Sequence, residues 1–264
     1  MKLAGECNCG AVTMSVSGEP SIISICHCTD CRRFTGHVSA YIIAFDAAEI
    51  TGPVRGWTTR AESGKEAVRF FCPHCGSGVY ARHIGEPRVF INGGLCIPGT
   101  LAPPTKEFWM RSAEPWDAAY PNTFAMEFQP LREPIPQRRL EWATAEGRCN
   151  CGQIRVGVKT IQHAVVCSCT TCRRFTGSIS AYLAIVGRDD LEMVGRPKTW
   201  SSLAESGRRV RRMFCGECGS SIAIEHDARV EVYGGILPLG SLPPPEGQRF
   251  RQNVEKWAKA YPVA

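Results

Sequence analysis

One spacing of seven cysteines occurs twice in this 264-residue chain and accounts for fourteen of its fifteen cysteines. Each copy begins with C-x-C, continues with C-x-C-x-x-C and ends with C-x-x-C, and the copies are offset by 141 to 143 residues. The chain therefore consists of two copies of one cysteine-rich unit. The first copy holds Cys7, Cys9, Cys26, Cys28, Cys31, Cys72 and Cys75, and the second holds Cys149, Cys151, Cys167, Cys169, Cys172, Cys215 and Cys218.

The repeat extends well beyond the cysteines. Residues 92–95 match residues 233–236, and Trp116 matches Trp257. Between the copies, residues 129–139 contain three prolines and no helical or strand periodicity, which indicates an extended and semi-rigid segment. A chain of this length suggests two domains. We predict a first zinc-binding domain at residues 1–127, a proline-rich linker at 128–140 and a second zinc-binding domain at 141–264.

Each copy is expected to be mostly β. Short runs rich in β-branched and aromatic residues, such as 38–45 and 67–71, are separated by glycine and proline, which is typical of short strands. One helical turn is expected at residues 29–34, with Thr29 as its N-cap. Tyr41 and Tyr182 occupy matching strand positions and are predicted to belong to the core.

The cysteines are expected to be reduced. The N-terminal residues contain no apolar run typical of a secretory signal, and no stretch reaches the ~18 apolar residues of a membrane span. In a reducing compartment, C-x-C and C-x-x-C spacings indicate metal or redox chemistry rather than disulfides. We therefore predict a cytoplasmic protein without a membrane partner. The odd thiol, Cys96, is replaced by Leu237 in the second copy and is predicted to be a small buried side chain.

Four cysteines of each copy are predicted to form a closed structural zinc site. In C-x-x-C-G, two intervening residues let both sulfurs face one ion, and the glycine permits a tight turn. The C-x-C pair can supply two more sulfurs, because alternate residues of a strand point to one side. The predicted sites are Cys7, Cys9, Cys72 and Cys75 in the first copy, and Cys149, Cys151, Cys215 and Cys218 in the second.

Three cysteines then remain in each copy, and two interpretations are open. Three thiolates can hold a zinc ion whose fourth position accepts a ligand, or a histidine can close a second structural site. A closing histidine should occur in both copies, but the candidates fall at unmatched positions, which favours the open site. The cysteines are Cys26, Cys28 and Cys31, and Cys167, Cys169 and Cys172; the histidines are His27, His37, His74 and His83, and His163 and His226.

Two arginines follow each three-cysteine group. They could bind ligand carboxylates, since guanidinium forms bidentate hydrogen bonds, or they could lie on the surface or compensate the zinc–thiolate charge. The sequence does not decide between these roles. The residues are Arg32 and Arg33, and Arg173 and Arg174.

The charge of the chain is mildly basic, with a net charge of +6 and a pI near 8.6. The densest basic run, 208–212, is interpreted as the exposed face of a strand. The overall charge falls short of that of a typical nucleic-acid-binding domain, so a nucleic-acid partner is not expected. Small acidic ligands are compatible with it.

The complete cysteine pattern, with arginine after the central group and glycine after the last, resembles the glutathione-dependent formaldehyde-activating enzyme family, which includes proteins similar to centromere protein V. The resemblance covers both halves and implies two tandem β-tent domains with two zinc ions each, hence four per chain. It implies that the three-cysteine groups are catalytic and the four-cysteine groups structural. The duplication departs from the single domain of a typical member.

The implied activity is that of a carbon–sulfur lyase. Its partners would be a small thiol such as glutathione and a small aldehyde, and its product S-hydroxymethylglutathione. The alternative is a non-enzymatic zinc-binding module for protein or nucleic-acid interaction.

Overall fold

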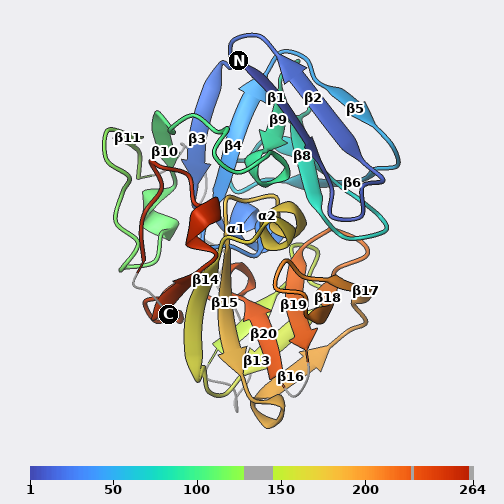
Figure 1. Ribbon diagram of the computed structural model, residues 1–264, viewed down its shortest axis with the longest axis vertical. Helices are drawn as coiled ribbons and strands as arrows, with labels where there is room; N and C mark the ends of the chain where they lie inside the picture. Colours follow the sequence, from blue (N-terminus) through green and yellow to red (C-terminus); the bar gives the residue numbers. More distant parts are fainter. Residues whose placement is uncertain (128–144, 227–228, 262–264) are drawn as a thin grey trace.

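Short strands dominate the computed structural model, which describes residues 1–127, 145–226 and 229–261 (Figure 1). Within these ranges, the longest helices are α1 (Thr29–Thr35) and α2 (Thr170–Thr176), with seven residues each. The prediction of a mostly-β fold is confirmed. The predicted linker at 128–140 lies outside the described residues.

The first copy contains a three-stranded and an eight-stranded sheet. The small sheet has the order β1-β2-β5, and the large sheet has the order β11-β10-β3-β4-β9-β8-β7-β6. The 3₁₀ helix η1 follows β9. The bounds are β1 Lys2–Glu6, β2 Thr13–Ser17, β3 Ile22–Cys26, β4 Ala40–Phe45, β5 Glu49–Thr51, β6 Arg55–Arg60, β7 Glu66–Phe71, β8 Gly78–His83, β9 Val89–Asn92, η1 Gly93–Leu95, β10 Lys106–Phe108, η2 Met110–Ser112 and β11 Phe124–Ala125.

The second copy repeats this topology, except that its described residues include no counterpart of β11. Its small sheet has the order β12-β13-β16, and its large sheet has the order β17-β18-β19-β20-β15-β14-β21. The bounds are β12 Ala145–Arg148, β13 Arg155–Val158, β14 His163–Cys167, β15 Ala181–Val186, η3 Arg188–Asp190, β16 Leu191–Val194, β17 Lys198–Leu203, β18 Arg209–Phe214, β19 Ser221–His226, β20 Arg229–Tyr233, η4 Gly234–Ile236, β21 Gly247–Arg249 and η5 Arg251–Asn253.

The alternation of side chains along a strand places an arginine on the buried face of each large sheet. In β7, Ala67, Arg69 and Phe71 are buried, whereas their neighbours are at least partly exposed. The equivalent strand β18 buries Arg212 in the same way, because successive side chains of a strand point to opposite faces. The interpretation of the whole run 208–212 as an exposed face is therefore wrong at Arg212.

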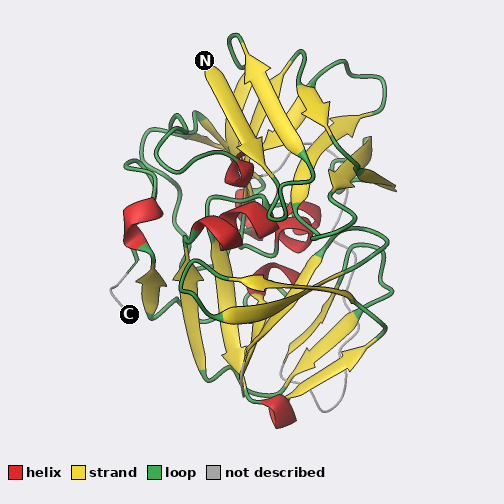
Figure 2. Cartoon of the chain, turned by 45° about the vertical axis from the view of Figure 1, so that its right-hand side comes forward, coloured by secondary structure: helices red, strands yellow, loops and turns green. Residues whose placement is uncertain are grey.

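The two copies pack tightly against each other through their helices. α1 lies against η4 of the second copy, and α2 lies against η1 of the first, between the two groups of sheets (Figure 2). The Gly94 N–H donates to the Gly177 carbonyl at 2.9 Å, and the Gly235 N–H donates to the Gly36 carbonyl at the same distance. A Cβ atom at Gly235 would lie 2.1 Å from the Arg32 carbonyl oxygen, so only glycine permits this approach.

Each copy also receives a tryptophan from the other. Trp116 stacks on Tyr182 with ring centroids 5.8 Å apart, and its indole N–H donates to the Leu242 carbonyl at 2.8 Å. Trp257 stacks on Tyr41 at 5.3 Å in the reciprocal arrangement. Both tyrosines are fully buried, as predicted. The C-terminal part of each copy thus completes the core of its neighbour. The division into domains at 1–127 and 141–264 stays a prediction.

Candidate metal and ligand-binding centres

The first four-cysteine cluster joins a turn after β1 to the turn between β7 and β8. The four sulfurs lie within 4.8 Å of one another. The Cys7 sulfur lies 3.5 Å from that of Cys9, which lies 3.7 Å from that of Cys72. A tetrahedron of sulfurs at about 2.3 Å from a zinc ion has edges of about 3.8 Å, so the spacing fits one ion.

Groups around this cluster stabilise the charged form of the Cys75 sulfur. The Val12 N–H donates to the Cys7 sulfur at 3.2 Å, and the Ser77 hydroxyl lies 3.2 Å from the Cys75 sulfur. Hydrogen bonds from Cys7 and Cys72, and then from Ser77, hold the pKa of Cys75 well below its ordinary value. All fifteen cysteines of the chain are free thiols. The cluster therefore has the chemistry of a metal site and not of a disulfide pair.

The second four-cysteine cluster has the same construction. Its sulfurs also lie within 4.8 Å of one another, with Cys149 and Cys151 3.4 Å apart and Cys151 and Cys215 3.5 Å apart. The Ser220 hydroxyl lies 3.3 Å from the Cys218 sulfur. Both copies therefore offer a four-sulfur donor set that suits zinc.

The three-cysteine cluster of the first copy surrounds the start of α1. Cys26 ends β3, Cys28 immediately precedes the helix and Cys31 lies in its first turn, with the sulfurs within 4.8 Å of one another. The Cys28 sulfur accepts from the Cys31 N–H at 3.4 Å. Cys28, not Thr29, is therefore the N-cap, because its side chain satisfies an N–H group that the helix leaves free. The prediction of Thr29 as N-cap is wrong.

The second copy repeats this loop. Its sulfurs, from Cys167, Cys169 and Cys172, also lie within 4.8 Å of one another. The Cys169 sulfur caps α2 by accepting from the Cys172 N–H at 3.3 Å. The helix cap thus fixes the positions of two sulfurs in each copy.

A buried arginine that the sequence analysis missed compensates the charge of each three-cysteine cluster. Arg69 is fully buried beside Cys31 and Asp30, and the negative charges of these groups raise its pKa despite the opposing effect of burial. Hydrogen bonds from Cys26 and Cys28, and then the charge of Arg69, hold the pKa of Cys31 well below its ordinary value. The sequence signal for Arg69 is a charged residue between two apolar residues, Ala67 and Phe71, on the inward-facing side of β7.

Arg212 takes the same place in the second copy. Its guanidinium donates to the Thr171 hydroxyl at 3.1 Å, and the charge of Cys172 raises its pKa against the effect of burial. Each three-sulfur cluster therefore has its own internal cation.

The histidines do not close either three-cysteine cluster. Among the described residues, no histidine has a nitrogen within 4.8 Å of all three sulfurs. His27 pairs with Glu107 at 3.1 Å. The expectation of unmatched histidines is wrong at one pair, because His83 ends β8 and His226 ends the equivalent strand β19. A shift of 143 residues, the same as for the C-x-x-C pairs, relates these two positions.

The sequence leaves carboxylate binding and charge compensation both open for four arginines, and three of them contact carboxylates of the protein. Arg32 is buried and pairs with Glu114 of its own copy, and Arg173 pairs with Glu255 at 2.7 Å. Arg174 lies 2.8 Å from a carboxylate oxygen of Glu6. These contacts direct the three guanidinium groups to protein carboxylates.

Arg33 is absent from the lining of the cavity beside the first three-cysteine cluster. Burial, and then the charge of Arg148, lower the pKa of Arg33 to about 10. A carboxylate-binding role for this arginine, as for the other three, remains an untested prediction that the observed surroundings do not favour.

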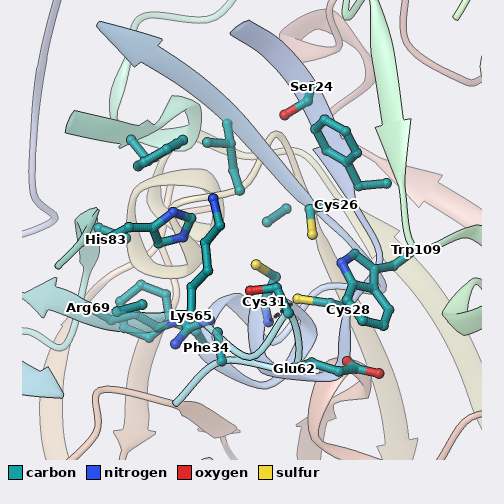
Figure 3. Close-up of a pocket in the computed structure, with 18 of the residues that line it drawn as sticks. Ser24, Cys26, Cys28, Cys31, Phe34, Glu62, Lys65, Arg69, His83 and Trp109 are labelled. Atoms are coloured by element: carbon teal, nitrogen blue, oxygen red, sulfur yellow. Dashed lines mark hydrogen bonds between the residues drawn. The ribbon is translucent and has the colours of Figure 1, made fainter. Parts of the chain in front are cut away.

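A cavity of about 140 Å³ opens beside the three-cysteine cluster of the first copy. Figure 3 shows the three sulfurs gathered at its centre, with His83 and Lys65 across the cavity from Cys26 and Cys28. Phe34, Phe90, Phe108 and Trp109 form apolar parts of its wall. The sulfurs therefore face a space that a small molecule can enter.

The polar rim of this cavity carries both signs of charge. Lys65 lies 2.6 Å and Arg88 2.7 Å from carboxylate oxygens of Glu86, and all three line the cavity. The hydrogen bond from Lys65, opposed by partial burial and reinforced by Arg88, lowers the pKa of Glu86 to about 2. Lys65 and Arg88 together exceed the single negative charge of Glu86, so this part of the rim keeps a positive charge that could bind an anionic ligand.

A family model described as "Glutathione-dependent formaldehyde-activating enzyme" matches residues 2–112 and again 144–260. The chain belongs to this family. Both copies of the glutathione-dependent formaldehyde-activating unit are thus present in one polypeptide, and membership supports an enzyme of the lyase type in the broad sense.

Solved structures match shorter parts of the chain, among them the following one. A Rhodobacter sphaeroides protein, described as a Northeast Structural Genomics target, is 22% identical, with 38% of this chain and 91% of that chain covered and a TM-score of 0.30. Separately, none of the helices within the described residues is long and apolar enough to cross a bilayer.

Proposed function

We propose that the chain is a zinc-dependent carbon–sulfur lyase. It would form S-hydroxymethylglutathione from glutathione and formaldehyde and cleave it back to these two compounds. The observation that carries the proposal is the three-sulfur cluster facing the cavity of the first copy. The family match supports the thiol and the aldehyde as substrates. Four zinc ions per chain, one for each cysteine cluster, are part of the proposal.

The donor set fits zinc in a ligand-binding role. Cys26, Cys28 and Cys31 would hold the ion through three sulfurs, which leaves its fourth position for a thiol from the cavity. A zinc ion held by the three sulfurs would lower the pKa of the incoming thiol and so supply a nucleophilic sulfur at neutral pH.

The protein's own residues have three tasks in this reaction. Arg69 compensates the negative charge of the cluster from inside the sheet. Lys65 and Arg88 at the rim would attract the carboxylates of glutathione, since cations near a cleft concentrate anionic ligands. The apolar wall would hold formaldehyde next to the sulfur, and this proximity lowers the entropic part of the barrier.

The chemical step is balanced without a further reactant. The thiol releases its proton, and its sulfur forms a bond to the formaldehyde carbon. The carbonyl π electrons move to oxygen, which takes up one proton to give the hydroxymethyl group. In the reverse direction, the hydroxyl loses its proton and the carbon–sulfur bond breaks. The protein therefore needs to position the reactants and exchange one proton with solvent.

The alternative of a nucleic-acid-binding module gains no support from the basic run. Within it, Arg211 pairs with Glu225, and Arg212 is buried beside the second three-cysteine cluster. The exposed positive charge is therefore smaller than the sequence indicates. Cytoplasmic localisation stays part of the proposal, since reduced thiols are needed at all four clusters.

The direct test is a glutathione titration of cobalt-substituted protein. Sulfur ligation should increase the sulfur-to-cobalt charge-transfer absorption, and Cys31→Ser should abolish the part of this increase that comes from the first copy while the four-cysteine clusters keep their metal. Unchanged absorption at saturating glutathione would reject direct sulfur binding.

The rim cations are tested by Lys65→Gln. Removing one partly exposed cation should raise KM for glutathione about 2–5-fold with little change in kcat, as for a surface ion pair of up to ~1 kcal/mol. Arg60→Gln, which removes another exposed cation outside the cavity, is the matched control. An equal effect of both variants would reject a role for Lys65 in binding.

A further inference from the structure

The two three-cysteine clusters differ at one structurally equivalent position. Asn92 pairs with Ile42 across the sheet of the first copy, and Tyr233 pairs with Leu183 in the same register of the second. Asn92 lines the cavity and is 5% exposed. Its side-chain N–H₂ has no hydrogen-bond partner among the described residues, which leaves a donor for a ligand in the cavity.

Tyr233 places a much larger side chain at this position. It is completely buried and stacks on Phe175 with centroids 5.4 Å apart. It belongs to one hydrophobic cluster with Cys167, Cys169 and Cys172. Its hydroxyl finds no hydrogen-bond partner within the described part of the chain. The ring therefore lies beside the second cluster where the first copy has space.

Other cavity positions are also enlarged in the second copy. The residues equivalent to Ala67 and Ala81, which line the first cavity, are Val210 and Ile224, which are buried beside the second cluster. Because protein interiors are close-packed, larger side chains at several wall positions remove the space itself. The filling is thus carried by three wall positions, Tyr233, Val210 and Ile224.

In the second copy, an ion pair replaces two of the apolar wall groups of the first cavity. Phe90 and Phe108 of the first cavity correspond to Glu231 and Arg249, which pair at 2.9 Å. His226 lies 3.2 Å from the same Glu231 carboxylate, so three side chains are linked to one another. Three linked polar side chains therefore occupy positions in the second copy where the first copy has Phe90, Phe108 and His83.

We infer that the two copies have diverged in function: the first three-cysteine centre takes an external ligand, and the second is sealed by Tyr233 and its enlarged neighbours. The second centre then serves the packing of the chain, and one thiol binds per polypeptide. This inference rests on the proposed function for the nature of the ligand, but the sealing itself does not depend on which ligand enters.

The experiment counts responsive metal centres in the full-length chain carrying four cobalt ions. Glutathione and imidazole are titrated separately, because imidazole reports an accessible coordination position without any thiol chemistry. We expect one responsive cobalt per chain. Asn92→Tyr should abolish the response without loss of bound cobalt, whereas Tyr233→Phe, the matched control, should leave one responsive centre.

The opening of the second centre completes the test. Tyr233→Asn combined with Val210→Ala and Ile224→Ala should double the response per chain. The wild type and Asn92→Tyr decide the matter if this triple variant does not fold. Three outcomes would overturn the inference. In the wild type these are two responsive cobalt ions per chain, or no cobalt ion that responds to imidazole. In Asn92→Tyr it is a response as large as that of the wild type. A response to imidazole at one centre without a response to glutathione would support the sealing and reject the proposed thiol chemistry.

Discussion

Replacing Cys75 by serine should unfold the protein, and replacing Cys31 by serine should not. Cys75 is fully buried in the first four-cysteine cluster, between β7 and β8. Structural zinc contributes about 10–16 kcal/mol of apparent binding free energy in small domains. A typical free energy of unfolding is only about 5–15 kcal/mol, so losing one of four ligands would remove most of the stability.

The contacts between the copies determine how far this loss spreads. Trp116 from the first copy stacks on Tyr182 of the second, and α1 packs against η4. Unfolding of the first copy would therefore expose part of the second core. We expect Cys75→Ser to lose the folded signal of both copies together and not to leave a half-sized transition.

Cys31→Ser gives the matched comparison, because the chemical change is the same. Its backbone N–H still donates to the Cys28 sulfur, so the cap of α1 is kept. The main loss is one of the two negative partners of Arg69, worth about 1.5–3 kcal/mol, while Asp30 still lies 3.7 Å from its guanidinium. For a chain of this size, that corresponds to a decrease in Tm of about 3–12 °C.

The assay combines thermal unfolding by far-UV circular dichroism with zinc analysis of each purified variant. Cys31→Ser should retain the ions of both four-cysteine clusters. Equal melting curves for the two variants, or full zinc content in Cys75→Ser, would refute the division into a structural and a ligand-binding cluster.

Three further predictions test other parts of the structure. Trp257→Ala removes a ring stacked on Tyr41 and a hydrogen bond to the Leu101 carbonyl. It should lower the free energy of unfolding, measured by urea titration, by about 3–5 kcal/mol, and Trp116→Ala should lower it by a similar amount. A loss below ~1 kcal/mol in both variants would contradict the reciprocal packing. Burial lowers the pKa of His37 to about 3, below its unfolded value of about 6.5. The contribution of neutral His37 to the free energy of unfolding is therefore present above pH ~6.5 and is lost as the pH falls towards 3. His37→Gln should flatten the decline of this free energy between about pH 6.5 and 5 at constant zinc content, and parallel curves for variant and wild type would count against this. A chelator of moderate affinity should release the ion of the first three-cysteine cluster before the other three, because that ion has three protein ligands beside a cavity; zinc analysis after stepwise dialysis checks the order, and earlier loss from Cys7, Cys9, Cys72 and Cys75 would reverse the assignment.

Side-chain direction explains why the sequence revealed some site residues and not others. The cysteine spacings predict the four clusters because two sulfurs in C-x-C or C-x-x-C can meet only within a narrow range of local geometries. Arg69 and Arg212 carry no comparable spacing signal, since their role depends on facing inward from a strand toward a loop distant in sequence. The matching of His83 with His226 becomes clear once β8 and β19 are aligned as strands.

The sequence alone determined the duplication, the mostly-β composition of each copy and the grouping of the cysteines, because these follow from local spacing and residue type. The tertiary structure decided how the copies interact and how they differ. Trp116 and Trp257 cross between the copies, and Tyr233 takes the space that Asn92 leaves open. Whether a side chain fills a cavity depends on the volume left by all its neighbours, and that volume exists only after the sheets have packed.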